Sequence, residues 1–174
     1  MAGVAVWPCG DDLHEGGRER RRPAAQPESM TTKLWIPLAS LAVALSPLAV
    51  VHPVRVSGHS MEPTLHSGDL RWMLRAWASH APRRGEVWVV ARPGGDAVKR
   101  VMGLPGDTVA WDGPDLRVDG HTLDEPWVVH PERDSAGSVT CGRGYLLLGD
   151  NRPVSRDGRA WGPLPRQAFE GRIL

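Results

Sequence analysis

A stretch of 18 residues without a charged side chain, residues 34–51 (LWIPLASLAVALSPLAVV), strongly limits what this chain can fold into. A helix of that length comes close to crossing the hydrocarbon core of a bilayer. Pro37 and Pro47 lie near its two ends, where membrane helices tolerate kinks. The pattern predicts a transmembrane helix over residues 34–52, with a buried helix of a soluble protein as the alternative.

The flanking charges orient this segment. Lys33 and an arginine cluster precede it, whereas only Arg55 follows it closely. Cytoplasmic flanks carry the excess of positive charge, so the amino terminus is expected in the cytoplasm and residues 53–174 outside. A cleaved secretory signal is disfavoured, because the apolar run is longer than usual and no small-x-small processing site follows it.

Residues 1–33 mix charge, glycine and proline without periodicity, which is typical of a disordered tail. Met30 could serve as the start instead of Met1, and the sequence leaves this open.

A net charge of +1 without a block of like charge argues against a nucleic-acid partner. Cys9 and Cys141 fall on opposite sides of the predicted membrane and cannot pair. The seven histidines are scattered, so no metal site is expected.

After the apolar segment, short β-rich runs alternate with turn signals. The six best strand candidates are DLRWMLRAW, EVWVVAR, AVKRVMGL, DTVAW, DLRVDG and YLLLGD. They predict a mainly β domain over residues 53–174.

Ser60 stands in VSGHSMEPTL, between a glycine-bearing bend and a proline. A serine hydroxyl becomes a nucleophile when a base takes its proton. His59 is its neighbour, but an adjacent residue seldom reaches back to the hydroxyl, and the chain lacks a G-x-S-x-G elbow. Serine–lysine dyads are the recognised alternative.

Lys99 is the base candidate. Of the 21 lysines and arginines, only Lys33 and Lys99 are lysines. Arginine does not lose its proton in proteins, whereas a buried lysine can. Strand alternation places Lys99 on an apolar face with Ala97 and Val101, and points Arg100 the other way. To be neutral at pH 7, its pKa must fall by roughly 3.4 units. The alternative is an ordinary surface lysine.

Three segments in order resemble the type I signal peptidases, which are membrane-bound serine–lysine proteases. SGHSMEPTLHSGD resembles the nucleophile box of that family, KRVMGLPGD its lysine box, and GDNRPVSRDGRAWG its third box. The match covers most of residues 56–164. It implies a signal-peptidase-like antiparallel β-sheet domain behind one amino-terminal transmembrane helix.

The resemblance assigns roles by residue. Ser60 would be the nucleophile and Lys99 the general base, without a metal or cofactor. Ser155 would orient the lysine ammonium, and Asp157 and Arg159 would form a bracing ion pair, with an exposed pair of little worth as the alternative. Further supporting residues would be Met61 beside the site and Gly149, Asp150 and Asn151 in the turn behind the dyad.

Two positions depart from the family pattern. Some relatives have a serine where this chain has Gly58, so the N–H of Ser60 would do more of the oxyanion binding. Gly158 stands where serine is frequent. The subdomain between Asp107 and Gly149 must also be small.

The expected function is cleavage of signal peptides from secretory precursors with small residues before the cut. The enzyme would be a single-pass, monomeric protein of the cell membrane, with the lipid bilayer as its other partner and the catalytic domain outside. A dedicated maturation protease that trims one partner stays open. Self-cleaving repressors of the LexA type lack an anchor, and an inactive binding module would not need both dyad residues.

Overall fold

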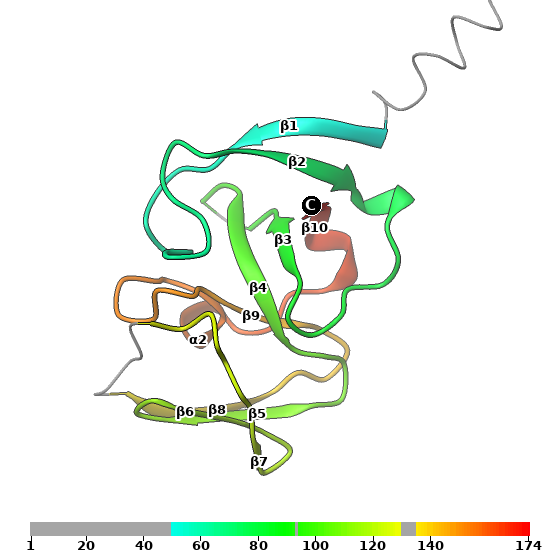
Figure 1. Cartoon of the computed structure of the whole chain (residues 1–174). Coiled ribbons are helices and arrows are strands. Elements are labelled where there is room, and N and C mark those ends of the chain that lie inside the picture. Colours follow the sequence, from blue (N-terminus) through cyan, green and yellow to red (C-terminus); the bar gives the residue numbers. More distant parts are fainter. Residues whose placement is uncertain (1–49, 93, 130–134) are drawn as a thin grey trace, which may run out of the picture. The chain divides into compact units, whose positions relative to one another are not determined.

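The computed structural model describes residues 50–92, 94–129 and 135–174. These residues form two antiparallel sheets and three short helical turns (Figure 1). The strands are β1 (Val51–Arg55), β2 (Leu70–Arg75), β3 (Val87–Val90), β4 (Ala97–Gly103), β5 (Thr108–Asp112), β6 (Asp115–Val118), β7 (His121–Thr122), β8 (Ala136–Thr140), β9 (Leu146–Leu148) and β10 (Phe169–Ile173). The helical turns are η1 (Ala76–Ala78), α2 (Gly158–Trp161) and η2 (Arg166–Ala168).

The larger sheet has six strands in the order β1-β2-β10-β3-β4-β9. β4 lies inside this sheet, where Lys99 pairs with Trp88 of β3 and Arg100 pairs with Leu148 of β9. An interior strand has both edges hydrogen-bonded, so its side chains are held in fixed directions. Any group on β4 is therefore placed rigidly.

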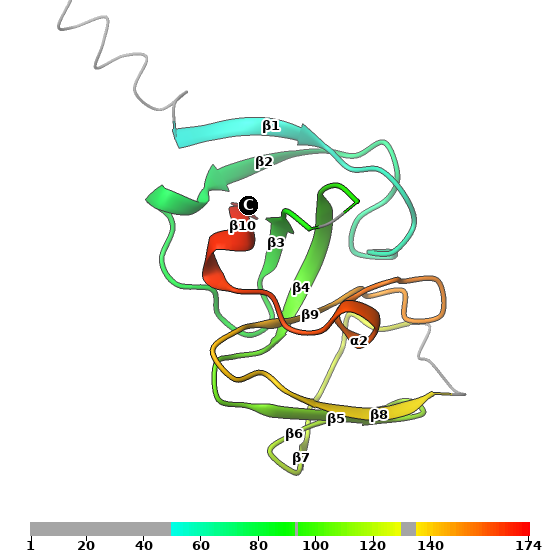
Figure 2. The same cartoon turned by 180° about the vertical axis from the view of Figure 1, so that it is seen from behind.

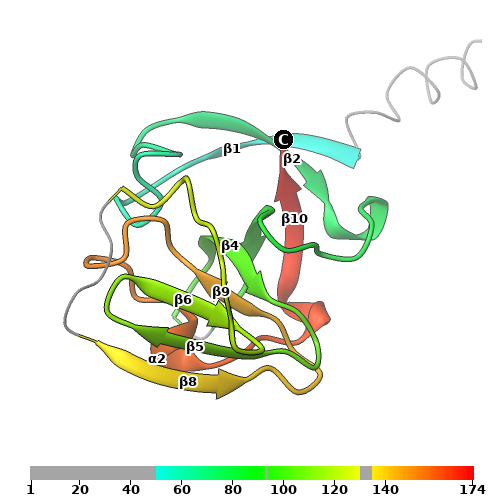
Figure 3. The same ribbon diagram turned by 60° about the horizontal axis from the view of Figure 1, so that its bottom comes forward.

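The smaller sheet has four strands in the order β7-β6-β5-β8 and occupies the chain between β4 and β9. Figure 3 brings this sheet forward, with β5, β6 and β8 below the larger sheet. Val109 of β5 is its centre, because it pairs with Val118 on one side and Val139 on the other and is fully buried. This sheet is the small subdomain expected between Asp107 and Gly149.

Three apolar clusters stabilise the domain. One joins the two sheets and includes Met102, Val109 and Leu146. A second surrounds Trp88 and Phe169, whose rings meet edge to face with centroids 5.4 Å apart. The third is small and lies under the loop between β1 and β2. β4 contributes side chains to all three clusters, because successive side chains of a strand point to opposite faces of the sheet.

Gly158 explains one departure from the family pattern. Figure 2 shows α2 beside β9, and a Cβ on Gly158 would lie 2.6 Å from Leu146 Cδ1 and 2.8 Å from the carbonyl oxygen of Leu147. Real Cβ atoms do not approach so closely. Glycine therefore lets the first turn of α2 pack directly on β9.

The prediction of a mainly β domain is confirmed, and each of the six predicted strands coincides with an observed one. The carboxyl-terminal limit of the predicted membrane segment was wrong, because Val51 and His52 belong to β1 and pair with Leu74 and Met73. Residues 1–33, and the predicted segment before residue 50, lie outside the described residues. Within the described part of the chain, no helix has the length and apolarity needed to cross a bilayer.

Candidate active site

The loop between β1 and β2, residues 56–69, carries Ser60 on a small core of its own. Met61 is 2% exposed and packs with Val56 and Leu65. The loop is closed at its base by a hydrogen bond from the Val56 N–H to the Asp69 carbonyl oxygen, 2.8 Å long. Met61 thus holds the residue beside Ser60 in place, which is the position that the resemblance implied for it.

Lys99 reaches Ser60 from β4. Its Nζ lies 2.5 Å from Ser60 Oγ and 3.0 Å from the carbonyl oxygen of Val98. Lys99 is 4% exposed. The structure therefore brings together the two residues that the sequence singled out, although 39 positions separate them.

Burial lowers the pKa of Lys99 from its ordinary 10.5 to about 8. This value is the net result, in which the carboxylate of Asp157 raises the pKa, repulsion from Arg92 lowers it, and the carboxylate of Asp150 raises it. The pKa of Lys99 therefore falls less than expected from the sequence, which called for a pKa near 7. With a pKa of about 8, roughly a tenth of the lysine is neutral at pH 7 and about half at pH 8.

This pKa predicts how stability depends on pH. Between about pH 8 and pH 10.5 the unfolded chain binds more protons at Lys99 than the folded chain, so the free energy of unfolding should rise with pH, by up to about 3 kcal/mol. Lys99→Met should lack this rise. Denaturant titrations of both proteins across this range measure the difference, in which the other titrating groups cancel. Parallel curves would mean that Lys99 keeps its ordinary pKa.

The turn at Gly149–Asn151 touches the back of the serine loop. The N–H of Asn151 donates to the Ser60 carbonyl oxygen and its Nδ2 to the His59 carbonyl oxygen, both over 3.1 Å. A Cβ on Gly149 would lie 2.5 Å from the Ser60 carbonyl oxygen and 2.1 Å from Ser155 Oγ. Glycine is needed there because the turn must approach Ser60 closely.

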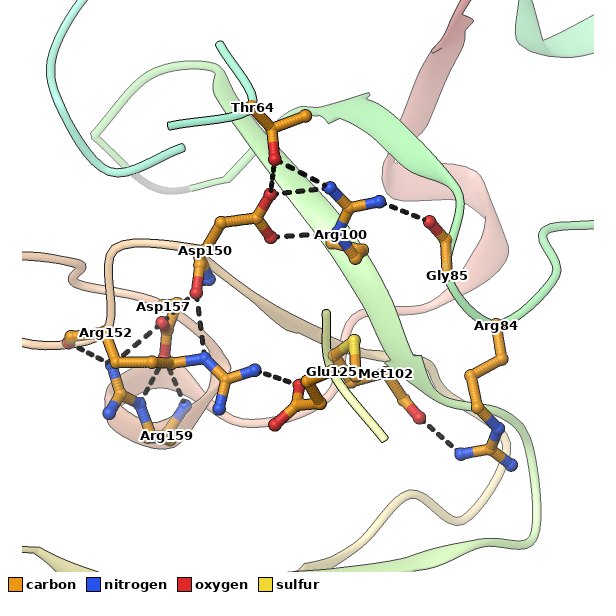
Figure 4. Close-up of polar contacts among 11 residues, drawn as sticks. Thr64, Arg84, Gly85, Arg100, Met102, Glu125, Asp150, Arg152, Asp157 and Arg159 are labelled. Carbon is orange, nitrogen blue, oxygen red and sulfur yellow. Dashed lines mark hydrogen bonds and ion pairs between the residues drawn. The ribbon is translucent and has the colours of Figure 1, made fainter. Parts of the chain in front are cut away.

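Asp150 forms a buried ion pair (Figure 4) with Arg100, the residue that follows Lys99 in β4. Arg100 Nε and Nη2 donate to the two carboxylate oxygens of Asp150 over 2.8 and 2.6 Å, and Thr64 Oγ1 donates to the same carboxylate over 2.6 Å. Arg100 is 7% exposed. Strand alternation does turn it away from Lys99, but the opposite face of β4 is buried as well.

Asp157 and Arg159 form the ion pair implied for them, and it is buried at the carboxylate. Asp157 is fully buried, with its oxygens 2.9 and 3.0 Å from Arg159 Nε and Nη2. Asp157 Oδ2 also accepts the N–H of Gly149 over 3.0 Å. The pair therefore links α2 to the turn behind Ser60, and the alternative of an exposed pair is wrong.

Ser155 does not make the contact implied for it. Its Oγ is buried and has no hydrogen-bond partner within the described part of the chain, so it donates nothing to, and accepts nothing from, Lys99. The hydroxyl lies next to Gly149 instead.

His59 is turned away from the serine hydroxyl. Its Nδ1 lies 2.8 Å from Glu62 Oε1, and its side chain is 69% exposed. Within residues 50–92, 94–129 and 135–174, the N–H of Ser60 forms no hydrogen bond to a backbone carbonyl oxygen. Gly58 precedes it in a left-handed conformation, with φ +89°.

A cavity of about 690 Å³ opens at the dyad. Its walls come from β1, β2, β3 and β4, and Ser60 and Lys99 lie among its lining residues. Val54, Met73 and Val89 contribute apolar side chains to its lining. Such a cavity accommodates several residues of an extended peptide. In the described ranges, no three histidine, cysteine or acidic residues gather as a metal site.

Sequence reasoning missed the residues that support the turn from outside. Arg152 is 5% exposed, and its Nη2 contacts Glu125 Oε1. Two of these residues had a signal in the sequence, because Arg100 follows Lys99 in the lysine box and Arg152 lies in the third box. Glu125 had no sequence signal.

Comparison with known proteins gives one consistent result. The family model described as "Signal peptidase, peptidase S26" matches residues 29–174. Signal peptidase IB of Staphylococcus aureus is 32% identical over 145 residues, covering 71% of this chain and 76% of the relative. A probable signal peptidase I-2 of Synechocystis is 33% identical over 170 residues, covering 88% and 78%. The crystal structure of a signal peptidase I from Enterococcus faecalis matches with a TM-score of 0.50 and 27% identity, covering 55% of this chain and 98% of that one.

Proposed function

Because the chain belongs to the signal peptidase family, peptidase S26, and is thus a serine endopeptidase, we propose that Ser60 is its nucleophile and Lys99 its general base. The observation that carries the assignment is the 2.5 Å contact between Lys99 Nζ and Ser60 Oγ in a site where the lysine is buried. A base must lie within hydrogen-bond reach of the proton it removes, and its pKa should be near the working pH. Lys99 meets both requirements.

The reaction follows from this arrangement. Neutral Lys99 takes the proton of Ser60 as Oγ attacks the scissile carbonyl carbon, and the oxygen that becomes negative is placed to accept the N–H of Ser60. Lys99 then gives its proton to the leaving amine, and an acyl-enzyme remains. Water, deprotonated by the same lysine, hydrolyses the ester and restores Ser60. The remaining named residues hold the frame: Met61, Gly149, Asp150, Asn151, Asp157 and Arg159 position the serine loop and β4.

The place of the reaction follows from the chain between the apolar segment and the nucleophile. Nine residues lie between Val50, the last residue before β1, and Ser60, so the Ser60 Cα lies at most about 35 Å from the end of the apolar segment. With that segment as a membrane anchor and residues 1–33 as a cytoplasmic tail, the catalytic domain works at the outer face of the membrane, where a secretory precursor emerges. The substrates are precursors with small residues before the cut.

Cleavage of a model precursor tests this function. The full chain in lipid vesicles should cut a precursor with alanines at the first and third positions before the site, and a matched precursor with leucines there should be cut at least about 100-fold more slowly. The leucine precursor controls for hydrophobic binding. Equal rates for the two precursors would contradict the assigned substrate class.

The second candidate, a protease dedicated to one partner, needs a different measurement. Amino-terminal proteomics after depletion of the protein should reveal many uncut precursors for a general peptidase. A single uncut precursor would establish the dedicated protease instead.

A further inference from the structure

Two buried arginines behind the dyad are covered by one short segment between β7 and β8. This segment is Glu125–Pro126–Trp127, which we name the clamp segment, and it follows β7. Figure 4 shows Glu125 reaching Arg152 on the side away from Arg159. Neither Glu125 nor Trp127 contacts the cavity at Ser60.

Glu125 holds Arg152. Its Oε1 contacts Arg152 Nη2, and the two side chains are 8% and 6% exposed. Arg152 Nε donates to the Gly149 carbonyl oxygen over 2.9 Å. A charge buried to this degree needs a counter-charge, so Arg152 can keep its place against Gly149 only while the carboxylate of Glu125 is present.

Trp127 covers Arg100. The Arg100 guanidinium carbon lies 4.4 Å from the centre of the Trp127 ring, within the range of a cation–π interaction. The same guanidinium donates to Asp150, to the Gly85 carbonyl oxygen and to Thr64. The ring closes the face of the guanidinium that these in-plane hydrogen bonds leave open.

Both arginines act on the turn that contacts the serine loop. Arg152 holds the carbonyl oxygen of Gly149, and Arg100 holds the carboxylate of Asp150. The next residue, Asn151, donates its N–H to the carbonyl oxygen of Ser60 itself. Each path from the clamp segment to the nucleophile therefore passes through one arginine and one residue of the turn.

We propose that Glu125 and Trp127 are positioning residues for the reaction, which hold the Gly149–Asn151 turn, and through it Ser60, at the distance from Lys99 that proton transfer requires. The inference rests on the proposed function of the dyad. It also assigns a role to the smaller sheet, because the connection between its strands β7 and β8 places the clamp segment against the two arginines. Displacement of a reacting group by about 1 Å can cost about 100-fold in rate.

The test compares four variants of the full chain in detergent micelles. Trp127→Leu removes the aromatic face but keeps an apolar side chain, whereas Trp127→Phe keeps the face. Glu125→Gln removes the charge with little change of shape. Asp107→Asn is the matched control, because it breaks another arginine–carboxylate pair, Arg84 Nη2 to Asp107 Oδ2 at 2.9 Å, whose arginine contacts the Met102 end of β4 instead of the turn.

The readouts are kcat and KM for a precursor, and amide hydrogen exchange at the Asn151 N–H. Trp127→Leu and Glu125→Gln should lower kcat about tenfold or more, with KM changed less than about twofold, and should speed exchange at Asn151. Trp127→Phe and Asp107→Asn should keep kcat within about threefold and leave that exchange unchanged.

The possible failures are distinguishable. If Trp127→Leu and Glu125→Gln match Asp107→Asn in kcat, or change KM alone, the positioning role is wrong. If Ser60→Ala keeps its activity, the dyad is wrong, but exchange at Asn151 still decides whether the clamp segment holds the turn. Unchanged exchange in both clamp variants overturns the inference without reference to cleavage.

Discussion

Ser60→Ala and Lys99→Ala are each expected to lose precursor cleavage by at least about 10⁴-fold. Alanine at 60 removes the attacking oxygen, and alanine at 99 removes the nitrogen that lies 2.5 Å from it. Residues that act as one unit give non-additive effects, so the double variant should be no slower than either single one. Single-turnover cleavage of a purified precursor measures these rates directly.

Lys99→Arg tests whether the site needs a base at position 99 or only a positive charge. Arginine keeps the positive charge and much of the stem, but it does not give up its proton in proteins. The variant should therefore be as inactive as Lys99→Ala if the lysine acts as a base. Activity within about tenfold of wild type would show that the site needs only a cation at this position.

His59→Ala is the matched control in the serine loop. The imidazole of His59 pairs with Glu62 on the surface and not with the Ser60 hydroxyl, so kcat should stay within about twofold of wild type. An inactive, folded His59→Ala variant would make histidine the base and overturn the lysine assignment.

The dyad could be predicted from sequence because its two residues obey different constraints. A serine nucleophile stands in a recognisable bend, and Lys99 was one of two lysines among 21 basic residues. Period-two alternation then placed Lys99 on an apolar face, as the structure has it. The same rule gave no hint that the opposite face of β4 is also buried, because burial of that face depends on the third box folding back against it.

The sequence analysis missed four strands, β1, β7, β8 and β10, and two of them, β1 and β8, show the local reasons. β1 begins inside the apolar run and contains Pro53, which is tolerated because β1 is an edge strand. β8 (Ala136–Thr140) has one valine and a glycine, and that glycine faces the Trp111 ring, where its Cβ would come within 2.4 Å. Both strands are specified by their partners, which a reading of single segments does not include.

The supporting contacts were predictable only in part. Asp157 and Arg159 lie two residues apart, so their ion pair could be expected from the motif. The contact of Glu125 with Arg152 joins positions 27 apart, in the segments that follow β7 and β9, and no local sequence pattern predicts it. Ser155 had the right residue type but lacks the expected contact to Lys99, since its hydroxyl lies against Gly149.

Asp150→Ala is expected to cost about 3 to 5 kcal/mol of the free energy of unfolding. The change leaves the Arg100 guanidinium buried without its carboxylate, and removing one partner of a buried pair costs that much because an unpaired charge remains in the interior. Domains of this kind have about 5 to 15 kcal/mol of stability, so the variant should be close to unfolding at 37 °C. Denaturant unfolding followed by tryptophan fluorescence measures the loss.

Two further variants separate the buried charge from other causes. Asp115→Ala breaks an exposed pair with Arg117, 3.6 Å apart and about half exposed, and should cost less than about 1 kcal/mol. Arg100→Met combined with Asp150→Leu removes both charges and should recover much of the stability that Asp150→Ala loses, because no unpaired ion is left. If Asp150→Ala lost no more free energy of unfolding than Asp115→Ala, water would be solvating the Arg100 guanidinium. The turn behind Ser60 could then not depend on this pair for its position.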